Sequence, residues 1–93
     1  MTVTHAVVLI EAERNALSTL GGALADIEGV AEAYSVTGEW DFVAIVRVPH
    51  HEQLAEVVTS QIGMLAGVTR TQTMVAFAAF SSHDLEALFS IGE

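Results

Sequence analysis

Ile27-Glu28-Gly29-Val30 recurs as Leu65-Ala66-Gly67-Val68, 38 positions further along the chain. The same offset places Ala6-Val7-Val8 on Ala44-Ile45-Val46. Self-similarity at one fixed spacing indicates a repeated architecture. In both copies a glycine follows an apolar stripe of helical spacing. Glycine is typical of the position just past the end of a helix. The repeat therefore predicts two units, each composed of a strand, a helix and a strand.

The periodicity of each segment predicts its secondary structure. Residues 3–12 are mainly aliphatic and contain no glycine or proline, which favours a strand. The apolar residues that follow are spaced by 3, 4 and 3 positions, which favours one face of a helix. The expected elements are strands over 3–12, 30–37, 40–48 and 68–80, helices over 13–27 and 51–65, and a short helix over about 82–91.

This order of elements is that of the ferredoxin-like fold, an α+β fold with a four-stranded antiparallel sheet. Each helix lies in a connection between two strands of the same sheet. Because strand–helix–strand connections are right-handed, both helices cover the same face of the sheet. The other face has no cover from its own chain, yet Val43 and Ile45 alternate onto it. A second copy of the sheet is the simplest cover, through a two-fold interface. We therefore expect a βαββαβ fold with a short C-terminal helix that pairs into a dimeric α+β barrel.

Charge and length exclude several classes of protein. The chain has 93 residues, with 12 acidic residues, three arginines and no lysine, so its formal net charge is −9. This length predicts a single domain over 1–93 with its core over 3–80. Three cations cannot neutralise the roughly 6–10 phosphates of a typical duplex contact, which excludes independent nucleic-acid binding. The apolar run at 6–10 is too short for a signal peptide or a membrane span, so we expect a cytoplasmic protein.

Groups for catalysis or metal binding do not form a recognisable set. Cysteine is absent, which excludes a disulfide framework and a thiolate metal site. His50 and His51 are adjacent and diverge at a helix start, so a polar helix N-terminus is favoured over a zinc site with Glu52 and Glu56. A nucleophile elbow, a phosphate loop and a dinucleotide fingerprint are all missing. We therefore expect no catalytic residues, no metal and no cofactor.

Three segments resemble the RAM domain, the effector domain of Lrp/AsnC regulators. Residues 36–42 resemble its Gly-x-Tyr-Asp segment, and Arg47-Val48-Pro49 resembles its strand-to-helix step. Residues 65–73 resemble its Pro-Gly-Val-x-x-Thr-x-Thr stretch. Trp40 replaces the usual Tyr, and Ala66 replaces the usual Pro. Full-length members carry a helix-turn-helix, which these 93 residues lack, so the chain looks like a stand-alone RAM protein. The resemblance implies dimers, often assembled into octameric rings, with amino acids bound between dimers.

Two groups of residues are candidates for a ligand site. Gly38 leaves room for a ligand, and the Asp41 carboxylate can accept hydrogen bonds from an ammonium group; the alternative is an ordinary turn with a solvated Asp. The hydroxyls of Thr69, Thr71 and Thr73 share one strand face and can hold a carboxylate with the amides of the Gly67-Val68 turn; the alternative is plain β-propensity.

Two aromatic residues and one arginine complete the candidate set. Tyr34 and Trp40 can wall a pocket, anchor an interface or fill the core. Arg70 points away from the three threonines and can pair with an acid, an interaction worth about 0–1 kcal/mol at a surface. The expected ligand-binding residues are Gly38, Trp40, Asp41, Thr69, Thr71, Thr73 and Tyr34.

These residues and the resemblance predict a non-enzymatic module that binds a small molecule, specifically an amino acid, and oligomerises. Its expected partners are further copies of itself, as a homodimer and as a tetramer to octamer, and a full-length Lrp/AsnC-type regulator with which it co-assembles. One alternative is a cofactor-free enzyme of the dimeric α+β barrel class, similar to small monooxygenases, with a pocket inside each protomer. Another is a structural assembly unit without a ligand.

Overall fold

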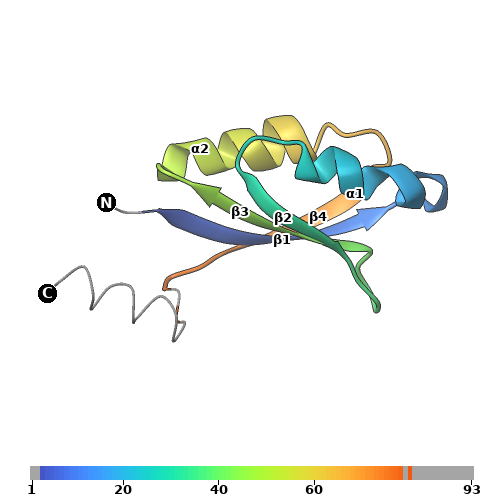
Figure 1. Cartoon of the computed structure of the whole chain (residues 1–93), viewed down its shortest axis with the longest axis horizontal. Coiled ribbons are helices and arrows are strands. Elements are labelled where there is room, and N and C mark those ends of the chain that lie inside the picture. Colours follow the sequence, from blue (N-terminus) through green and yellow to red (C-terminus); the bar gives the residue numbers. More distant parts are fainter. Residues whose placement is uncertain (1–2, 79, 81–93) are drawn as a thin grey trace, which may run out of the picture.

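The computed structural model describes residues 3–78 and 80, and it arranges them as one sheet with one layer of helices (Figure 1). The expected helix over 82–91 lies outside the described residues. The elements in chain order are β1 (Thr4–Ala12), the 3-10 turn η1 (Arg14–Ala16), α1 (Leu17–Ala25), β2 (Val30–Ser35), β3 (Phe42–Val48), α2 (His51–Ala55), the π-helical η2 (Glu56–Ile62) and β4 (Val68–Val75).

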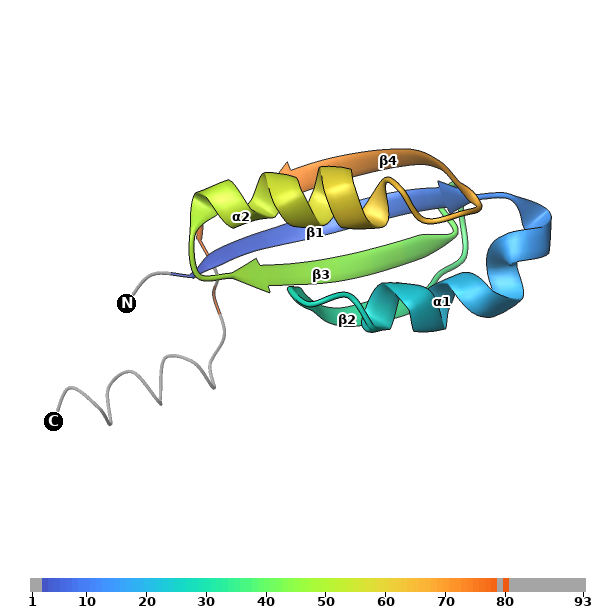
Figure 2. The ribbon, with the colours of Figure 1, turned by 90° about the horizontal axis from the view of Figure 1, so that it is seen from above.

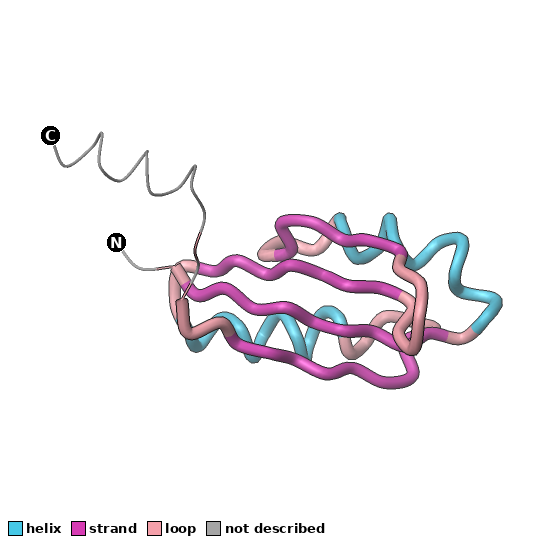
Figure 3. Tube along the Cα trace, turned by 90° about the horizontal axis from the view of Figure 1, so that it is seen from below, coloured by secondary structure: helices cyan, strands magenta, loops and turns pink. Residues whose placement is uncertain are grey.

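The four strands form an antiparallel sheet in the order β2-β3-β1-β4. Seen from above, α2 and η2 follow β1 and β3, whereas α1 lies beside β2 (Figure 2). Seen from below, the strands are in front and the helices are behind them (Figure 3). The predicted ferredoxin-like βαββαβ order is therefore confirmed, with both helices on one face.

The core lies between the sheet and the helices, and strand register explains its composition. Cross-strand partners point to the same face, and Ala6 pairs with Val46 while Val8 pairs with Ala44. All four of these side chains are buried beneath the helices. The strands bury Ala6, Val8, Ile10, Val30, Phe42, Ala44, Val46 and Val48, and the helices bury Leu20, Leu24, Leu54, Val57 and Ile62.

The second helix differs from the continuous helix expected over 51–65. It begins as α-helix at His51, changes to π-helix at Glu56 and ends at Ile62. The Gly63 N–H donates to the Val58 carbonyl over 2.8 Å, the i→i+5 bond of a π-helix. This geometry buries Val57 and Ile62, which are five positions apart. Helical spacing alone already places both residues on the apolar face of this helix, but it does not predict the π-helical hydrogen bonds.

Several other expected boundaries are wrong by a few residues. The first helix starts with the 3-10 turn η1 and ends at Ala25 rather than at Ile27. The strands expected over 30–37 and 40–48 stop at Ser35 and start at Phe42, because the Val36 N–H donates to the Asp41 carbonyl across a wider turn. The strand expected over 68–80 ends at Val75.

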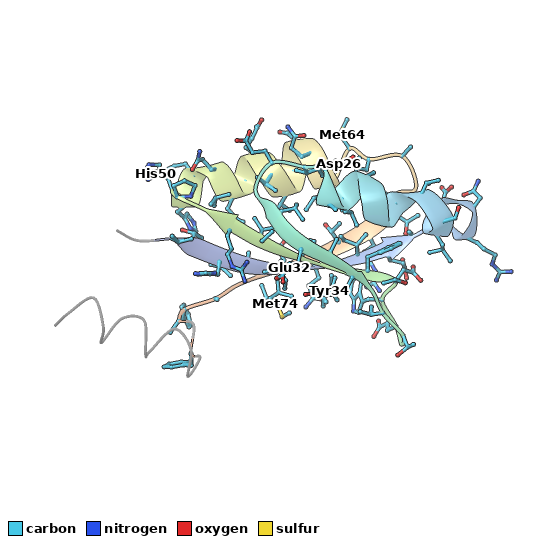
Figure 4. All side chains as sticks on the ribbon, in the orientation of Figure 1. Asp26, Glu32, Tyr34, His50, Met64 and Met74 are labelled. Atoms are coloured by element: carbon cyan, nitrogen blue, oxygen red, sulfur yellow. The ribbon has the colours of Figure 1, made fainter. Side chains whose placement is uncertain are left out.

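The uncovered side of the sheet, called the open face below, carries a strip of apolar side chains. Glu32, Tyr34 and Met74 lie on this side of the ribbon, whereas Asp26, His50 and Met64 lie on the helix side (Figure 4). Cross-strand register places Val7, Leu9, Val43 and Ile45 beside Met74 on the open face. These four aliphatic side chains are only partly buried within the single chain.

We predict that Gly67→Ala destabilises the fold whereas Gly22→Ala stabilises it. Gly67 has φ +97° and an added Cβ would overlap the Cβ of Ala16, so the substitution should cost about 1–3 kcal/mol. Gly22 lies inside α1 with open space around its Cα, so alanine should gain about 0.5–1 kcal/mol. Thermal unfolding followed by circular dichroism compares the two variants; equal melting temperatures would contradict the assignment of Gly67.

Candidate functional site

The candidate site lies at one end of the sheet, where the β2–β3 turn approaches the end of β1 and the start of β4. Figure 1 shows this turn, residues 36–41, extending below the sheet on the open-face side. The end of β1 is irregular, because its register with β4 shifts between Glu11 and Ala12. Such a bulge redirects side chains and interrupts the regular ladder.

Asp41 connects the turn to β1 through both its backbone and its side chain. Its backbone N–H donates to the Ile10 carbonyl over 2.9 Å, and its Oδ2 accepts a hydrogen bond of 2.8 Å from the Ala12 N–H. The carboxylate is therefore held in place by the irregular end of β1. One oxygen has a structural role, and among residues 3–78 and 80 no partner occupies Oδ1.

Arg70 joins the turn to β4. Its guanidinium carbon lies 4.3 Å from the centre of the Trp40 ring, and its Nη2 lies 3.4 Å from Oε2 of Glu39. Its Nε lies 3.6 Å from Oε1 of Glu11 on β1. The expected ion pair of Arg70 is thus confirmed, and Trp40 lies against Arg70 rather than in the core. Glu11 and Glu39 were not foreseen, since they are 28 positions apart in the chain.

Thr69 completes the group, which we call the turn cluster: Glu11, Glu39, Trp40, Asp41, Thr69 and Arg70. The Thr69 hydroxyl donates to the Glu11 backbone carbonyl over 3.0 Å, and its oxygen also lies 3.3 Å from Oε1 of Glu11. Gly38 lies in the same turn with φ +109° and open space around its Cα. Four of the seven expected ligand-binding residues therefore come together here: Gly38, Trp40, Asp41 and Thr69.

Thr71 and Thr73 lie apart from the turn cluster within one chain. They pair with Ile10 and Val8, so they face the helix side of the sheet, opposite to Arg70. Thr73 lines a shallow, mainly apolar groove of about 300 Å³ between β4 and the second helix. The other residues of this groove are His51, Glu52, Leu54, Ala55, Val58 and Thr59.

Tyr34 lies far from the threonines, on the edge strand β2 at the opposite side of the sheet. Its hydroxyl donates to Oε2 of Glu32 over 3.1 Å, and Oε1 of Glu32 lies 3.6 Å from Nη2 of Arg47. The hydrogen bond to Glu32, together with the negative charge of that carboxylate, raises the pKa of the Tyr34 phenol. Tyr34 thus belongs to a polar network on the open face and not to the turn cluster.

A larger groove, which sequence reasoning missed, lies on the helix side. It has a volume of about 620 Å³ between the α1–β2 loop, the end of β3 and the second helix. Its polar lining includes Glu28, Glu56, Gln53 and Gln61. Within the described part of the chain, no three His, Asp or Glu side chains converge as metal ligands. No helix among these residues has the length and hydropathy needed to cross a membrane.

Comparison with known proteins identifies relatives of this fold and sequence. A protein of Thermus thermophilus, TTHA0845, is 48% identical with a TM-score of 0.79, and the match covers 86% of this chain and 99% of that one. An uncharacterized HTH-type transcriptional regulator of Pyrococcus furiosus is 39% identical over 54 residues, which are 58% of this chain and 36% of the regulator. The chain thus aligns with about a third of the length of this curated relative.

A more distant structure shares the fold alone. The transcriptional regulator NMB0573 of Neisseria meningitidis, solved as an L-Met complex, is 14% identical with a TM-score of 0.75. The match covers 84% of this chain and 52% of that one. The family model of the Lrp/AsnC ligand binding domain matches residues 5–85, which is most of the chain. The chain therefore belongs to the Lrp/AsnC ligand-binding domain family.

Proposed function

We propose that this chain is an amino-acid-binding and self-associating effector module that acts on Lrp/AsnC-type regulation. The observation that carries the proposal is the turn cluster, built within a domain of that ligand-binding family. Its Asp41 carboxylate is fixed by the Ala12 N–H and presents a second oxygen. A carboxylate held in this way is a suitable acceptor for the ammonium group of an amino acid.

The surroundings of Asp41 also suit the carboxylate of an amino acid. Among residues 3–78 and 80, the backbone N–H groups of 37–40 donate to no other group of the chain. Exposed turn amides are the type of donor that proteins use to hold anionic groups. One turn would thus supply a carboxylate for the ammonium group of an amino acid and backbone N–H groups for its carboxylate. The L-Met complex of NMB0573 supports the proposal, because the same fold holds an amino acid in that protein.

Self-association is proposed through the open face. The apolar strip of Val7, Leu9, Val43, Ile45 and Met74 is bordered by the ion pairs Glu32–Arg47 and Glu11–Arg70. Each arginine thus offsets one carboxylate beside the strip, although the whole chain has a net charge of −9. An apolar strip bordered by paired charges can pack against its own copy with reduced charge repulsion, which favours a two-fold dimer.

A complete ligand site then requires more than one copy. Thr71 and Thr73 lie on the helix side of β4, away from the turn cluster of their own chain. We place them against the turn cluster of a neighbouring dimer in a tetramer or octamer. Through such contacts the module would co-assemble with a full-length regulator in the cytoplasm. A ligand would alter this assembly only by binding one state more tightly than the other.

Wild-type protein should bind at least one of the twenty amino acids in isothermal titration calorimetry. Asp41→Asn should weaken that binding roughly tenfold or more, about 1.4 kcal/mol, because it removes the charge that pairs with the ammonium group. The asparagine oxygen can still accept the Ala12 hydrogen bond, so the melting temperature should change little.

Asp26→Asn is the matched control, since it removes the same charge at the end of α1 on the helix side. Its affinity should equal that of the wild type. If no amino acid binds at millimolar concentration, or if both variants lose affinity equally, the proposed site is wrong.

Ile45→Lys should dissociate the dimer, because it buries an unpaired charge in the middle of the apolar strip. Size-exclusion chromatography with light scattering should give at least twice the chain mass of 9.9 kDa for the wild type and 9.9 kDa for the variant. Leu17→Lys, at an exposed position on α1, should remain dimeric. A monomeric wild type at micromolar concentration would exclude the interface.

A further inference from the structure

Arg70 has surroundings that differ from those of an ordinary surface ion pair. Its guanidinium lies over the face of the only tryptophan in the chain, 4.3 Å from the ring centre. Two carboxylates also approach it, from Glu39 at 3.4 Å and from Glu11 at 3.6 Å. Within the described part of the chain, Arg47 on the same sheet face has one carboxylate partner, Glu32 at 3.6 Å. Among the described residues, the combination of a ring and two acids is found at Arg70 alone.

An aromatic face together with carboxylates is the arrangement with which proteins bind cationic ligand groups. The ring quadrupole attracts a cation over its face, and carboxylates add charge-assisted hydrogen bonds. In this chain the three groups come from two separate places: Glu11 from β1, and Glu39 and Trp40 from the β2–β3 turn. With Asp41 next in the turn, three carboxylates belong to the same cluster as one guanidinium, so the cluster stays negative even with Arg70 in place.

We infer that Trp40, Glu39 and Glu11 form a receptor for a cationic group, and that Arg70 occupies it as a tethered competitor. The ligand of the turn cluster would then be a small molecule with a guanidinium or primary ammonium side chain, such as a cationic amino acid. The inference rests on the proposed function, because it names the ligand class for that site. It also assigns Arg70 a regulatory role, since the ligand must displace it.

Displacement of Arg70 has consequences for affinity and for shape. A tethered group competes at an effective concentration in the millimolar range, so it lowers the apparent affinity for a free ligand. Arg70 is also the residue that connects the β2–β3 turn to β4 through Glu39 and Trp40. Ligand binding would therefore release the turn from β4, at the edge of the open face through which copies pair.

The test uses Arg70→Ala and the fluorescence of the single tryptophan. Removal of the arginine side chain should vacate the receptor, and L-arginine, L-lysine and methylguanidinium should then change Trp40 fluorescence with saturation. The affinity for L-arginine should be at least tenfold higher than in the wild type. Citrulline, the neutral isostere of arginine, should give no such increase, and added sodium chloride should keep the ionic strength constant.

Two variants serve as controls. Arg47→Ala removes an arginine from the same sheet face but leaves the receptor occupied, so its response should match that of the wild type. Arg70→Ala combined with Glu39→Gln should lose the gain in affinity, because one of the two carboxylates is neutralised. If Arg70→Ala shows no saturable response, or responds like Arg47→Ala, the inference is overturned.

The outcomes also separate this inference from the proposed function. If the wild type binds only amino acids with neutral side chains and Arg70→Ala gains no affinity for cations, the inference fails and the effector function stands. If Arg70→Ala binds cations while the wild type binds no amino acid at millimolar concentration, the receptor is supported and the effector function fails.

Discussion

The central position of β1 is the constraint on which the rest of the structure depends. Both edges of this strand are occupied, by β3 and β4, and its Ala6, Val8 and Ile10 side chains are almost completely buried. The strand ends in a bulge, where the Ala12 N–H donates a hydrogen bond to the side chain of Asp41. At the same end of the strand, Glu11 accepts a hydrogen bond from Thr69 and forms an ion pair with Arg70. The turn cluster is thus a direct result of how the central strand ends.

Charge is distributed unequally between the two sides of the sheet. Asp26, Glu28, Glu52 and Glu56 belong to the helix layer and its loops, whereas Arg47 and Arg70 each form an ion pair with a carboxylate on the open face. A uniform distribution of a −9 charge would oppose self-pairing of any surface. The two ion pairs reduce that obstacle beside the apolar strip, and in the proposed dimer the acids of the helix layer would face outward.

The sequence predicted the order of the elements and the composition of the core, because strand parity and helical spacing decide which side chains meet the opposite layer. Phe42, Ala44 and Val46 share a face for this reason. The π-helical turn of η2 was missed, since its i→i+5 bonds depend on packing against the sheet and not on local preference. Trp40, Asp41, Thr69 and Arg70 of the turn cluster were singled out from the sequence, whereas Glu11 and Glu39 were missed, because contacts between β1, the turn and β4 exist only once the sheet has formed. Tyr34, Thr71 and Thr73 belong to other surfaces of the chain.

The one-sided helix layer has a consequence for the stability of the protein. In the proposed dimer, part of the apolar area that holds the native state together is buried only after two chains meet. Folding and association are then linked by mass action, so the midpoint of unfolding rises with protein concentration. The amount of protein in the cell would itself decide how much of it is folded, and dilution would act on this domain as a mild denaturant.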